Sequence, residues 1–576
     1  MLRTFETHKI RKYRELTGSN WTFTALSGDM AKESFPVFTP SNWESYPGFF
    51  EYRGCADYIT DFRANGNLRL IFEGVSHTAK VYVDDEFVTE HYNAYTPFDA
   101  IIKNAEDITH TLKINVDNSF GEKSALHIPN DYMTYGGINR PIALEEISDV
   151  FVRFVHVSTK MAGNSLSWEV TVEISLQNIT DSVKTVSVIS EFAAQKITWD
   201  NVTVPADSAL ILRNSVICDN ITEWSPENPH LYEINTVLYE NGIATDDLID
   251  RFGFREIRIS GKKILLNNKP ILIKGFCRHE DHPEFCAALP AQAMAYDLDL
   301  IRDVGANSVR TSHYPNDERF LDMCDERGIL VWEENHARGL SLSDMQNPNF
   351  EPQAEKVICE MIEAHFNHPS IYIWGILNEC ASETEYGREC YKKQLALIKS
   401  LDSTRPTSFA SCKFKTDICL DLPDVVSYNI YPLWYHNTPV KEYLNDLYSW
   451  VQNETGGNGK PFMITETGAG GIYGVHTPYD EKWTEEYQAK VVKEQISTIL
   501  ANENCCGVYI WQFCDVRVSR EWFHVRPRCM NNKGIVDEYR RKKLAYKEVK
   551  EIFEEYGNNS SIPLFKFSKS SSVPGI

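Results

Sequence analysis

The pattern of apolar and polar positions changes along this chain and divides it into regions. Residues 1–147 hold short alternating runs, such as LRLIFEGV and KVYVDDEFV, separated by Gly, Pro and Asn. Residues 148–256 continue with longer runs, such as VFVRFVHVST and SWEVTVEISLQN, at the spacing of roughly ten residues that is typical of sandwiches. Alternation with a period of two marks strands with one buried face. We therefore predict an all-β domain followed by a small β-sandwich.

From Ile257 onward, continuous apolar runs of strand length alternate with helical patterns such as EPQAEKVICEMIEAHFN. Eight runs have this character: 271–277, 308–313, 329–335, 371–379, 406–412, 425–432, 462–468 and 507–515. Eight buried strands with intervening helices predict a (β/α)8 (TIM) barrel over 257–556. A doubly wound sheet is the alternative, but no Gly-rich phosphate loop follows any run. The Ser-rich residues 557–576 are expected to form a flexible tail.

Composition narrows the class of partner. The chain has 58 Lys and Arg against 81 Asp and Glu, a net charge of −23, which disfavours a nucleic-acid partner. No apolar stretch reaches the ~18 residues that suggest a membrane span. The first residues, MLRTFETHKIRKYREL, contain no apolar segment of a secretory signal, and the 14 cysteines form no C-x-x-C motif. We therefore expect a cytoplasmic protein with reduced thiols and no membrane partner.

Polar residues gather where the predicted barrel strands end, which is where this fold carries its chemistry. These strand-end residues are Arg278, His279, Glu280, Asp281, Arg310, His313, Glu333, Glu334, Asn335, Asn378, Glu379, Asn429, Tyr431, Glu466, Trp511, Gln512 and Asp515. A single glutamate at a strand end is usually a solvated or helix-capping group. A whole set at successive strand ends favours a catalytic site.

Glu379 and Glu466 end two strands that can face each other across the barrel mouth. Hydrolysis of a glycosidic bond needs such a pair, in which one carboxylic acid protonates the leaving oxygen and the other carboxylate attacks the anomeric carbon. Their environments must separate the two pKa values. We expect Arg310 and Tyr431 to keep Glu466 charged while Glu379 holds the proton.

The run His279-Glu280-Asp281-His282 could suggest a metal site. However, neighbouring residues of an extended segment point in opposite directions, and a catalytic zinc site needs spaced histidines. We predict no metal.

Four strings closely resemble glycoside hydrolase family 2: GFCRHEDHP (275–283), GANSVRTSHYP (305–315), NHPSIYIWGILNE (367–379) and MITETGAGG (463–471). A fifth, TYGGINRP (134–141), resembles a first-domain segment of that family. The domain order is also similar: a jelly-roll-like β domain, an immunoglobulin-like β-sandwich and the barrel. The likeness extends from about Arg14 to about Lys547.

The resemblance implies a role for each matching residue. Glu379 corresponds to the general acid/base, Glu466 to the nucleophile and Asn378 to the residue that contacts the sugar 2-hydroxyl. The other matches line the sugar subsite: Arg310, His279 and His313, with Tyr431 beside the nucleophile and Trp511 as the aromatic floor. The resemblance also implies a homo-oligomer. The predicted chemistry requires no cofactor, and the sequence leaves open whether a flavin nucleotide binds elsewhere, as in some relatives.

Three further segments resemble the β-glucuronidases of the family. Asn531 and Lys533 match an Asn-x-Lys motif that binds the uronate carboxylate, and YNIYPLWY (428–435) supplies Asn429, Tyr431 and Tyr435. In NDYMTYGGINR (130–140), Asp131 matches an aspartate that reaches the sugar hydroxyls. The alternative for Asn531–Lys533 is a simple turn, since Asn and Gly favour turn geometry. We predict a retaining exo-β-glucuronidase acting on β-glucuronides or glucuronide conjugates.

Arg338 departs from the glucuronidase pattern, in which a small or apolar residue is usual at this position. An arginine at the barrel mouth could bind a carboxylate and shift preference toward β-galacturonides, whose 4-hydroxyl is axial. A β-galacturonidase or dual enzyme is therefore the first alternative, a β-galactosidase a weaker one, and a surface arginine without such a role another. A non-catalytic sugar-binding relative is disfavoured by Asn378, Glu379 and Glu466. The compact segment after Arg338 predicts an open cleft.

Overall fold

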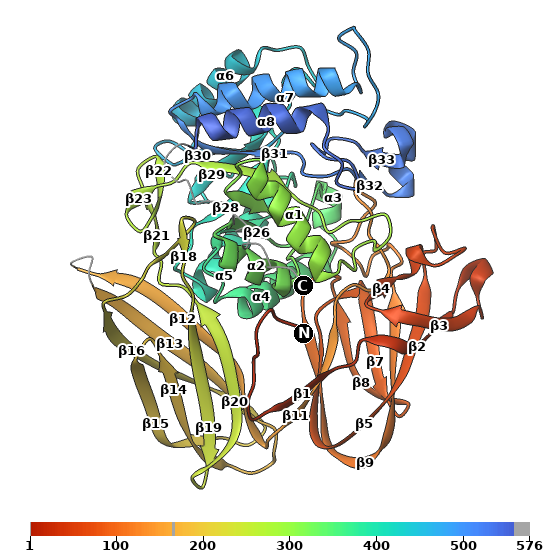
Figure 1. Ribbon diagram of the computed structural model, residues 1–576, viewed down its shortest axis with the longest axis vertical. Coiled ribbons are helices and arrows are strands. Elements are labelled where there is room, and N and C mark those ends of the chain that lie inside the picture. Colours follow the sequence, from red (N-terminus) through yellow and green to blue (C-terminus); the bar gives the residue numbers. More distant parts are fainter. Residues whose placement is uncertain (1, 164–166, 558–576) are drawn as a thin grey trace, which may run out of the picture.

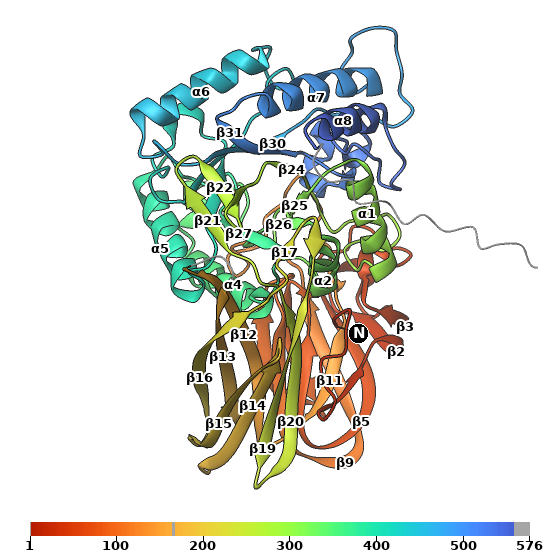
Figure 2. The same ribbon diagram turned by 60° about the vertical axis from the view of Figure 1, so that its left-hand side comes forward.

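The computed structural model describes residues 2–163 and 167–557 as three regions (Figure 1). The closed barrel lies above two β domains that stand side by side beneath it, and a view turned by 60° shows the same arrangement (Figure 2). The predicted limits at 147/148 and 256/257 fall between strands β11 and β12 and between β20 and β21. The fold class predicted from the sequence is confirmed.

The first domain is built on an eight-stranded antiparallel sheet. Six of its strands have the order β1-β11-β5-β9-β7-β8, and β2 pairs with β5 on one side and with β3 on the other. Its strands are β1 (Lys12–Glu15), β2 (Gly18–Ala25), β3 (Ser34–Thr39), β4 (Ser41–Asn42), β5 (Cys55–Phe72), β6 (Val75–Ser76), β7 (Thr78–Val83), β8 (Glu86–Tyr92), β9 (Phe98–Asp117), β10 (Gly137–Ile138) and β11 (Ile142–Ile147). Alternate residues of β5 are buried, as the period of two predicts, and pack around Phe23, Trp43 and Tyr58.

The sandwich pairs a sheet β12-β13-β16 with a sheet β15-β14-β19-β20, and Trp168 and Phe254 pack in its core. Its strands are β12 (Val150–Ala162), β13 (Ser167–Asn178), β14 (Lys184–Phe192), β15 (Gln195–Val204), β16 (Ser208–Asp219), β17 (Trp224–Ser225), β18 (Asn228–Pro229), β19 (Tyr232–Glu240) and β20 (Ile243–Phe252). A small sheet of β21 (Ile257–Ser260), β22 (Lys263–Leu266) and β23 (Lys269–Pro270) leads into the barrel.

The eight predicted barrel strands are all present and close on themselves: β24 (Ile273–Cys277), β25 (Ser308–Arg310), β26 (Leu330–Glu334), β27 (Ile371–Ile376), β28 (Thr407–Ser411), β29 (Val425–Asn429), β30 (Phe462–Thr467) and β31 (Cys505–Ile510). Every residue of these strands is buried, which explains why their sequences read as continuous apolar runs. The helices are α1 (Ala291–Asp303), α2 (Glu318–Arg327), α3 (Leu342–Met345), α4 (Phe350–His365), α5 (Glu385–Leu401), α6 (Val440–Glu454), α7 (Glu485–Leu500) and α8 (Leu544–Glu555).

After β31 the chain forms β32 (Val516–Arg517), the 3-10 segments η4 (Arg520–Val525) and η5 (Pro527–Cys529), and β33 (Met530–Asn531). This excursion carries Asn531 and Lys533 to the barrel mouth. The predicted tail, apart from Gly557, lies outside the described residues.

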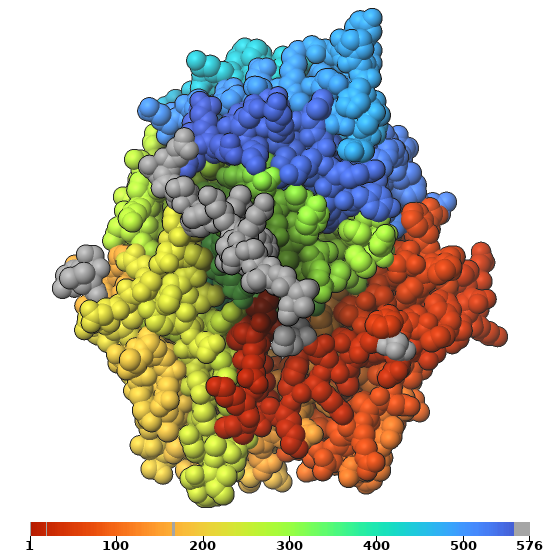
Figure 3. Space-filling view, in the orientation of Figure 1, coloured from red at the N-terminus to blue at the C-terminus, as the bar shows by residue number. Residues whose placement is uncertain are grey.

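The N-terminal segment fills the groove between the two β domains, where Figure 3 shows it in dark red. The Arg11 guanidinium donates to Glu145 of the first domain (2.9 Å) and to Asp246 of the sandwich (2.8 Å). Arg3 donates to Asp322 on barrel helix α2 at 2.7 Å. The segment therefore links all three regions.

No helix in the described part of the chain has the length and apolarity needed to cross a membrane.

Candidate active site

A fully buried arginine, Arg310 at the end of β25, organises the barrel mouth. Its guanidinium donates two hydrogen bonds to Glu334 (2.9 Å each), one to Glu466 (2.9 Å) and one to the side-chain oxygen of Asn378 (2.8 Å). Planar bidentate contacts of this kind fix both the arginine and its partners. Arg310 thereby sets the positions of groups from three further strands.

Glu466 ends β30 and accepts a hydrogen bond on each of its oxygens. Arg310 donates to Oε1 at 2.9 Å, and the Tyr431 hydroxyl donates to Oε2 at 2.7 Å. These are the two neighbours expected from the sequence. With both oxygens accepting, the remaining lone pairs are held in a fixed direction, as a nucleophile requires.

The electrostatic expectation for Glu466 is corrected by the structure. Burial and then the charge of nearby Glu379 raise the pKa of Glu466 to about 7, and Arg310 and Tyr431 act in the opposite direction without overcoming these effects. The expectation considered the two donors and left out the desolvation that accompanies them. Glu466 therefore titrates near neutrality in the unliganded site.

Glu379 follows β27 with a left-handed backbone (φ 56°) and a partly exposed side chain. The Asn429 amide donates to its Oε1 at 2.9 Å, and the Arg338 guanidinium lies 3.7 Å from its Oε2. Asn378 accepts from Asn429 (3.1 Å) as well as from Arg310, so it connects the surroundings of the two glutamates.

The aromatic wall of the site is formed by Trp511, as the resemblance implies. The His313 ring stacks on it at 5.1 Å between centroids, and the His279 ring meets it edge-on at 5.4 Å. Burial holds the pKa of both histidines well below the usual range, so both rings are neutral. An apolar face bordered by neutral donors and acceptors suits the face of a sugar ring.

Several of the predicted sugar-binding residues carry a buried polar atom that has no hydrogen-bond partner among the described residues. These atoms are Asn378 Nδ2, His279 Nε2, His313 Nε2, Asp131 Oδ1 and Asn531 Oδ1. Buried polar groups are normally satisfied. The five atoms named here could pair with the hydroxyl groups of a polyhydroxylated ligand.

Asp131, from the first domain, reaches into this site and is held by one ion pair and two hydrogen bonds. Arg338 Nη2 lies 3.2 Å from its Oδ1, and Arg526 (3.0 Å) and Asn531 (3.2 Å) donate to its Oδ2. Burial alone would raise the pKa of Asp131, but Arg338, Arg526 and Lys533 together hold it below the usual range. Arg338 is therefore part of the site and not a surface residue.

Lys533 is 2% exposed, and no carboxylate lies within ion-pairing distance of its ammonium in the described part of the chain. The ammonium faces the rings of Tyr435 (5.3 Å), Tyr431 (5.7 Å) and Trp434 (5.9 Å). A buried cation without a counter-ion is costly unless a ligand supplies one. The turn given as the alternative for Asn531–Lys533 is present at residues 532–533, and it places the Lys533 ammonium beside these aromatic rings.

Two residues that contact this site were given no role by the sequence analysis. Glu334 was named among the strand-end residues, and it holds both Arg310 and His313 (2.7 Å). Arg526 lies in an irregular segment without any periodic signal. Of the acidic run after β24, Glu280 pairs with Arg140 (2.9 Å) and Asp281 accepts from Tyr135 (2.7 Å), so both join the barrel to the first domain.

Comparison with known proteins agrees with this geometry. The model of the glycosyl hydrolases family 2 TIM barrel domain matches residues 257–558, and the glycosyl hydrolases family 2 model matches residues 150–255. A β-glucuronidase from Streptococcus agalactiae is 28% identical over 549 residues, covering 86% of this chain and 88% of the relative.

Solved structures show the same likeness. The crystal structure of a family 2 β-galacturonidase from Eisenbergiella tayi bound to galacturonate superposes with a TM-score of 0.94 at 55% identity, covering 96% of this chain and 99% of the other. The β-D-glucuronidase of Dictyoglomus thermophilum superposes with a TM-score of 0.81 at 25% identity, covering 96% and 98% of the two chains. With matching sequence models and architecture, the chain belongs to glycoside hydrolase family 2 and is a glycoside hydrolase.

Proposed function

We propose that the protein is a retaining exo-β-uronidase that acts on β-D-galacturonides, with β-D-glucuronides as second substrates. The observation that carries the proposal is the buried Lys533 ammonium, which lies beside the rings of Tyr431 and Tyr435 and has no carboxylate within ion-pairing distance among the described residues. A uronate carboxylate would supply that counter-ion through a charge-assisted hydrogen bond. Neutral sugars offer no such partner, so they should be poor substrates.

In the proposed mechanism, the ionised Glu466 attacks the anomeric carbon and Glu379 donates its proton to the leaving oxygen. The glycosidic bond breaks and a glycosyl–Glu466 ester forms. Glu379, now a carboxylate, removes a proton from water, which hydrolyses the ester and regenerates both groups. Asn378 Nδ2 is free to donate to the 2-hydroxyl. Neither step needs a metal or an organic cofactor.

Arg338 favours galacturonide over glucuronide in this proposal. Its backbone bridges to Asn378, and its guanidinium lies between Asp131 and Glu379. In a galacturonide the axial 4-hydroxyl leaves the plane of the ring, where a cation such as Arg338 can donate to it. The 55% identity to the E. tayi β-galacturonidase supports the same preference. The β-glucuronidase relatives and the Asn531–Lys533 motif keep glucuronides as the second candidate.

The test compares p-nitrophenyl β-D-galacturonide, glucuronide, galactoside and mannoside. We expect the galacturonide to give the highest kcat/KM, the glucuronide to follow and the neutral sugars to be hydrolysed least. Lys533→Ala should lower kcat/KM on both uronides by roughly 10- to 100-fold, the size of a hydrogen bond to a charged group. A control, Lys413→Ala, removes a lysine after β28 that pairs with Glu383 (3.1 Å) and should change little.

The variant Arg338→Ala tests whether Arg338 determines the preference for galacturonide over glucuronide. The ratio of kcat/KM for galacturonide to that for glucuronide should fall about tenfold, the size of one hydrogen bond. An unchanged ratio would remove Arg338 as the specificity residue. Higher activity on galactoside than on either uronide would refute the role of Lys533 and the proposal itself.

A further inference from the structure

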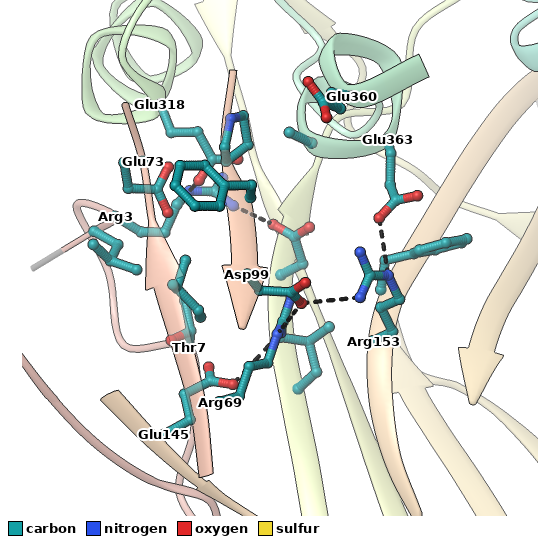
Figure 4. A pocket seen from close by; sticks show the side chains of 18 of the residues that line it. Arg3, Thr7, Arg69, Glu73, Asp99, Glu145, Arg153, Glu318, Glu360 and Glu363 are labelled. Atoms are coloured by element: carbon teal, nitrogen blue, oxygen red, sulfur yellow. Dashed lines mark hydrogen bonds and ion pairs between the residues drawn. The ribbon is translucent and has the colours of Figure 1, made fainter. Parts of the chain in front are cut away.

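A second cavity lies outside the active site, where the first domain, the sandwich, the barrel helices and the N-terminal segment meet. Its volume is about 430 Å³. It is lined by Glu73 and Asp99 of the first domain, Arg153 of the sandwich, Glu318 of α2 and Glu360 of α4 (Figure 4). None of the predicted active-site residues lines it.

The charges around this cavity do not balance. Eight Asp and Glu residues line it against five Lys and Arg. The arginines are already engaged by carboxylates: Arg69 (2.6 Å) and Arg153 (2.9 Å) both contact Asp99, and Arg3 contacts Asp322. The lining therefore has an excess of negative charge that its own cations leave unneutralised.

Glu73 is the residue in the cavity lining that most clearly lacks a neutralising partner. It is 8% exposed, and within residues 2–163 and 167–557 no hydrogen bond or ion pair to its carboxyl group is present. The charged groups around it are the acids Glu318 and Asp317 and the cations Arg140 and Arg3, whose effect is smaller. Glu318 itself has only a long contact, 3.6 Å to Arg3. Burial and the charge of Glu318 raise the pKa of Glu73 well above its usual range. The buried Glu73 carboxyl group and the largely buried Glu318 carboxyl group thus share the cavity, and within the described residues no cation forms an ion pair with Glu73.

We propose that this cavity binds an aliphatic polyamine, with one primary ammonium group held by Glu73 and Glu318. A primary ammonium is a compact charge with three donors, so it can donate to both carboxylates at once. Glu360 and Glu363 lie at the opposite side of the cavity (Figure 4), where Glu360 contacts His91 and Glu363 contacts Arg153 (3.1 Å each), and a second ammonium of the same molecule can add a further contact to them. The bound amine would connect the first domain to the barrel, since Glu73 and Glu318 belong to these two regions.

A metal ion fits the cavity less well. Among the described residues, the one group of three with metal-ligand spacing is Asp322, Asp325 and His368, and Arg3 already binds Asp322 through two nitrogens. Among the described residues, Glu73 and Glu318 do not belong to a group of three side chains that could bind a metal ion. Their arrangement therefore suits a nitrogen cation with several N–H donors.

The experiment measures spermidine and putrescine binding to the full-length protein by isothermal titration calorimetry and by thermal melting. We expect saturable heat and a saturable rise in melting temperature, because a ligand that binds only the folded state stabilises it. Tetramethylammonium chloride at equal ionic strength carries charge without N–H donors and should give neither. Absence of saturable binding by both amines would overturn the proposal, and so would an equal effect of calcium chloride.

Variants locate the site. Glu73→Gln should weaken spermidine binding at least tenfold and raise the melting temperature of the free protein, since a buried like-charge contact is removed. Glu318→Gln should weaken binding similarly. Glu90→Gln is the matched control, because Glu90 lines the same cavity but is exposed, and it should bind as the parent does. Parent-like binding by both Glu73→Gln and Glu318→Gln would overturn the assignment. Hydrolysis of aryl uronides by all three variants should equal that of the parent.

Discussion

The two glutamates of the active site differ in what surrounds each carboxyl group. Glu466 is buried and accepts from Arg310 and Tyr431, whereas Glu379 is partly exposed and accepts from Asn429. The pKa of Glu466 is raised to about 7 by burial and by the charge of Glu379. Ionisation of the nucleophile near neutral pH therefore depends on the protonation of the other glutamate, which is how a coupled pair behaves.

Glu379→Gln removes that charge and should lower the pKa of Glu466. Since attack requires the ionised form, the acidic limb of the pH profile should move to lower pH by about one unit, a typical effect of a neighbouring like charge. The measurement is kcat/KM against pH with 2,4-dinitrophenyl β-galacturonide, whose leaving group needs no protonation. Glu383→Gln, four residues along, is the control. An acidic limb that stays in place in Glu379→Gln would contradict the coupling.

For single residues, the sequence predicts which side chains gather at the active site. It does not predict how their surroundings change their pKa values. Arg310, Asn378 and Glu466 could be found because they stand at or just after the ends of continuous apolar runs. Arg526 could not, because its loop has no repeating pattern and only tertiary packing brings it to Asp131. The raised pKa of Glu466 also depends on desolvation by side chains distant in sequence, which no local pattern encodes.

Among the elements, the barrel strands were the most predictable, because complete burial leaves an uninterrupted apolar run. The first run was predicted from residue 271, whereas β24 begins at Ile273, and the small sheet of β21–β23 before it was missed. Strands of two to four residues are too short to show a period. The segment between β32 and β33, residues 518–529, was also not predicted, because its 3-10 turns are too short to show a period.

The end of helix α2 gives a prediction at this scale. Gly328 ends the helix with a φ of 67°, and a Cβ atom there would lie 2.3 Å from the carbonyl oxygen of Pro226. Gly459 has a φ of 77°, but nothing lies within 4 Å of its Cβ position. Both alanine substitutions impose left-handed strain of about 1–2 kcal/mol.

Only Gly328→Ala must also displace the backbone at Pro226, in the turn between β17 and β18 that lies against the end of α2. Thermal melting should therefore show a decrease for Gly328→Ala that exceeds the decrease for Gly459→Ala by several degrees. Equal decreases in the two variants would show that the chain near Pro226 moves aside without cost.

In the molecule as a whole, the N-terminal segment joins the domains through Arg11. Removing one partner of a buried ion pair typically costs about 3–5 kcal/mol, so Arg11→Ala should lower the melting temperature strongly. The neighbouring Lys12 contacts Glu146 at 2.8 Å with its side chain 77% exposed. Lys12→Ala is therefore the control, with an expected loss below about 1 kcal/mol.

The loss of melting temperature in Arg11→Ala should become smaller as the pH falls. Burial would raise the pKa of Glu145, but Arg11 and His8 hold it below the ordinary value of 4.5. A carboxylate with a depressed pKa in the folded state contributes stability above its unfolded value and loses it as the pH falls. The difference in melting temperature between parent and Arg11→Ala should thus be full at pH 7 and shrink below about pH 4.5. A constant difference across this range would contradict the pairing.

The position of Asp131 has a consequence for how such enzymes can diversify. Because a loop of the first domain supplies this carboxylate, the barrel by itself is not a portable catalytic module. A recombined gene that joins this barrel to a different N-terminal domain would keep Arg310, Glu379 and Glu466 but lose the acceptor that Arg338, Arg526 and Asn531 surround. Selection on sugar preference can therefore act through a domain that contains neither glutamate. A chimeric protein with a different first domain should still hydrolyse glycosides but should prefer different sugars.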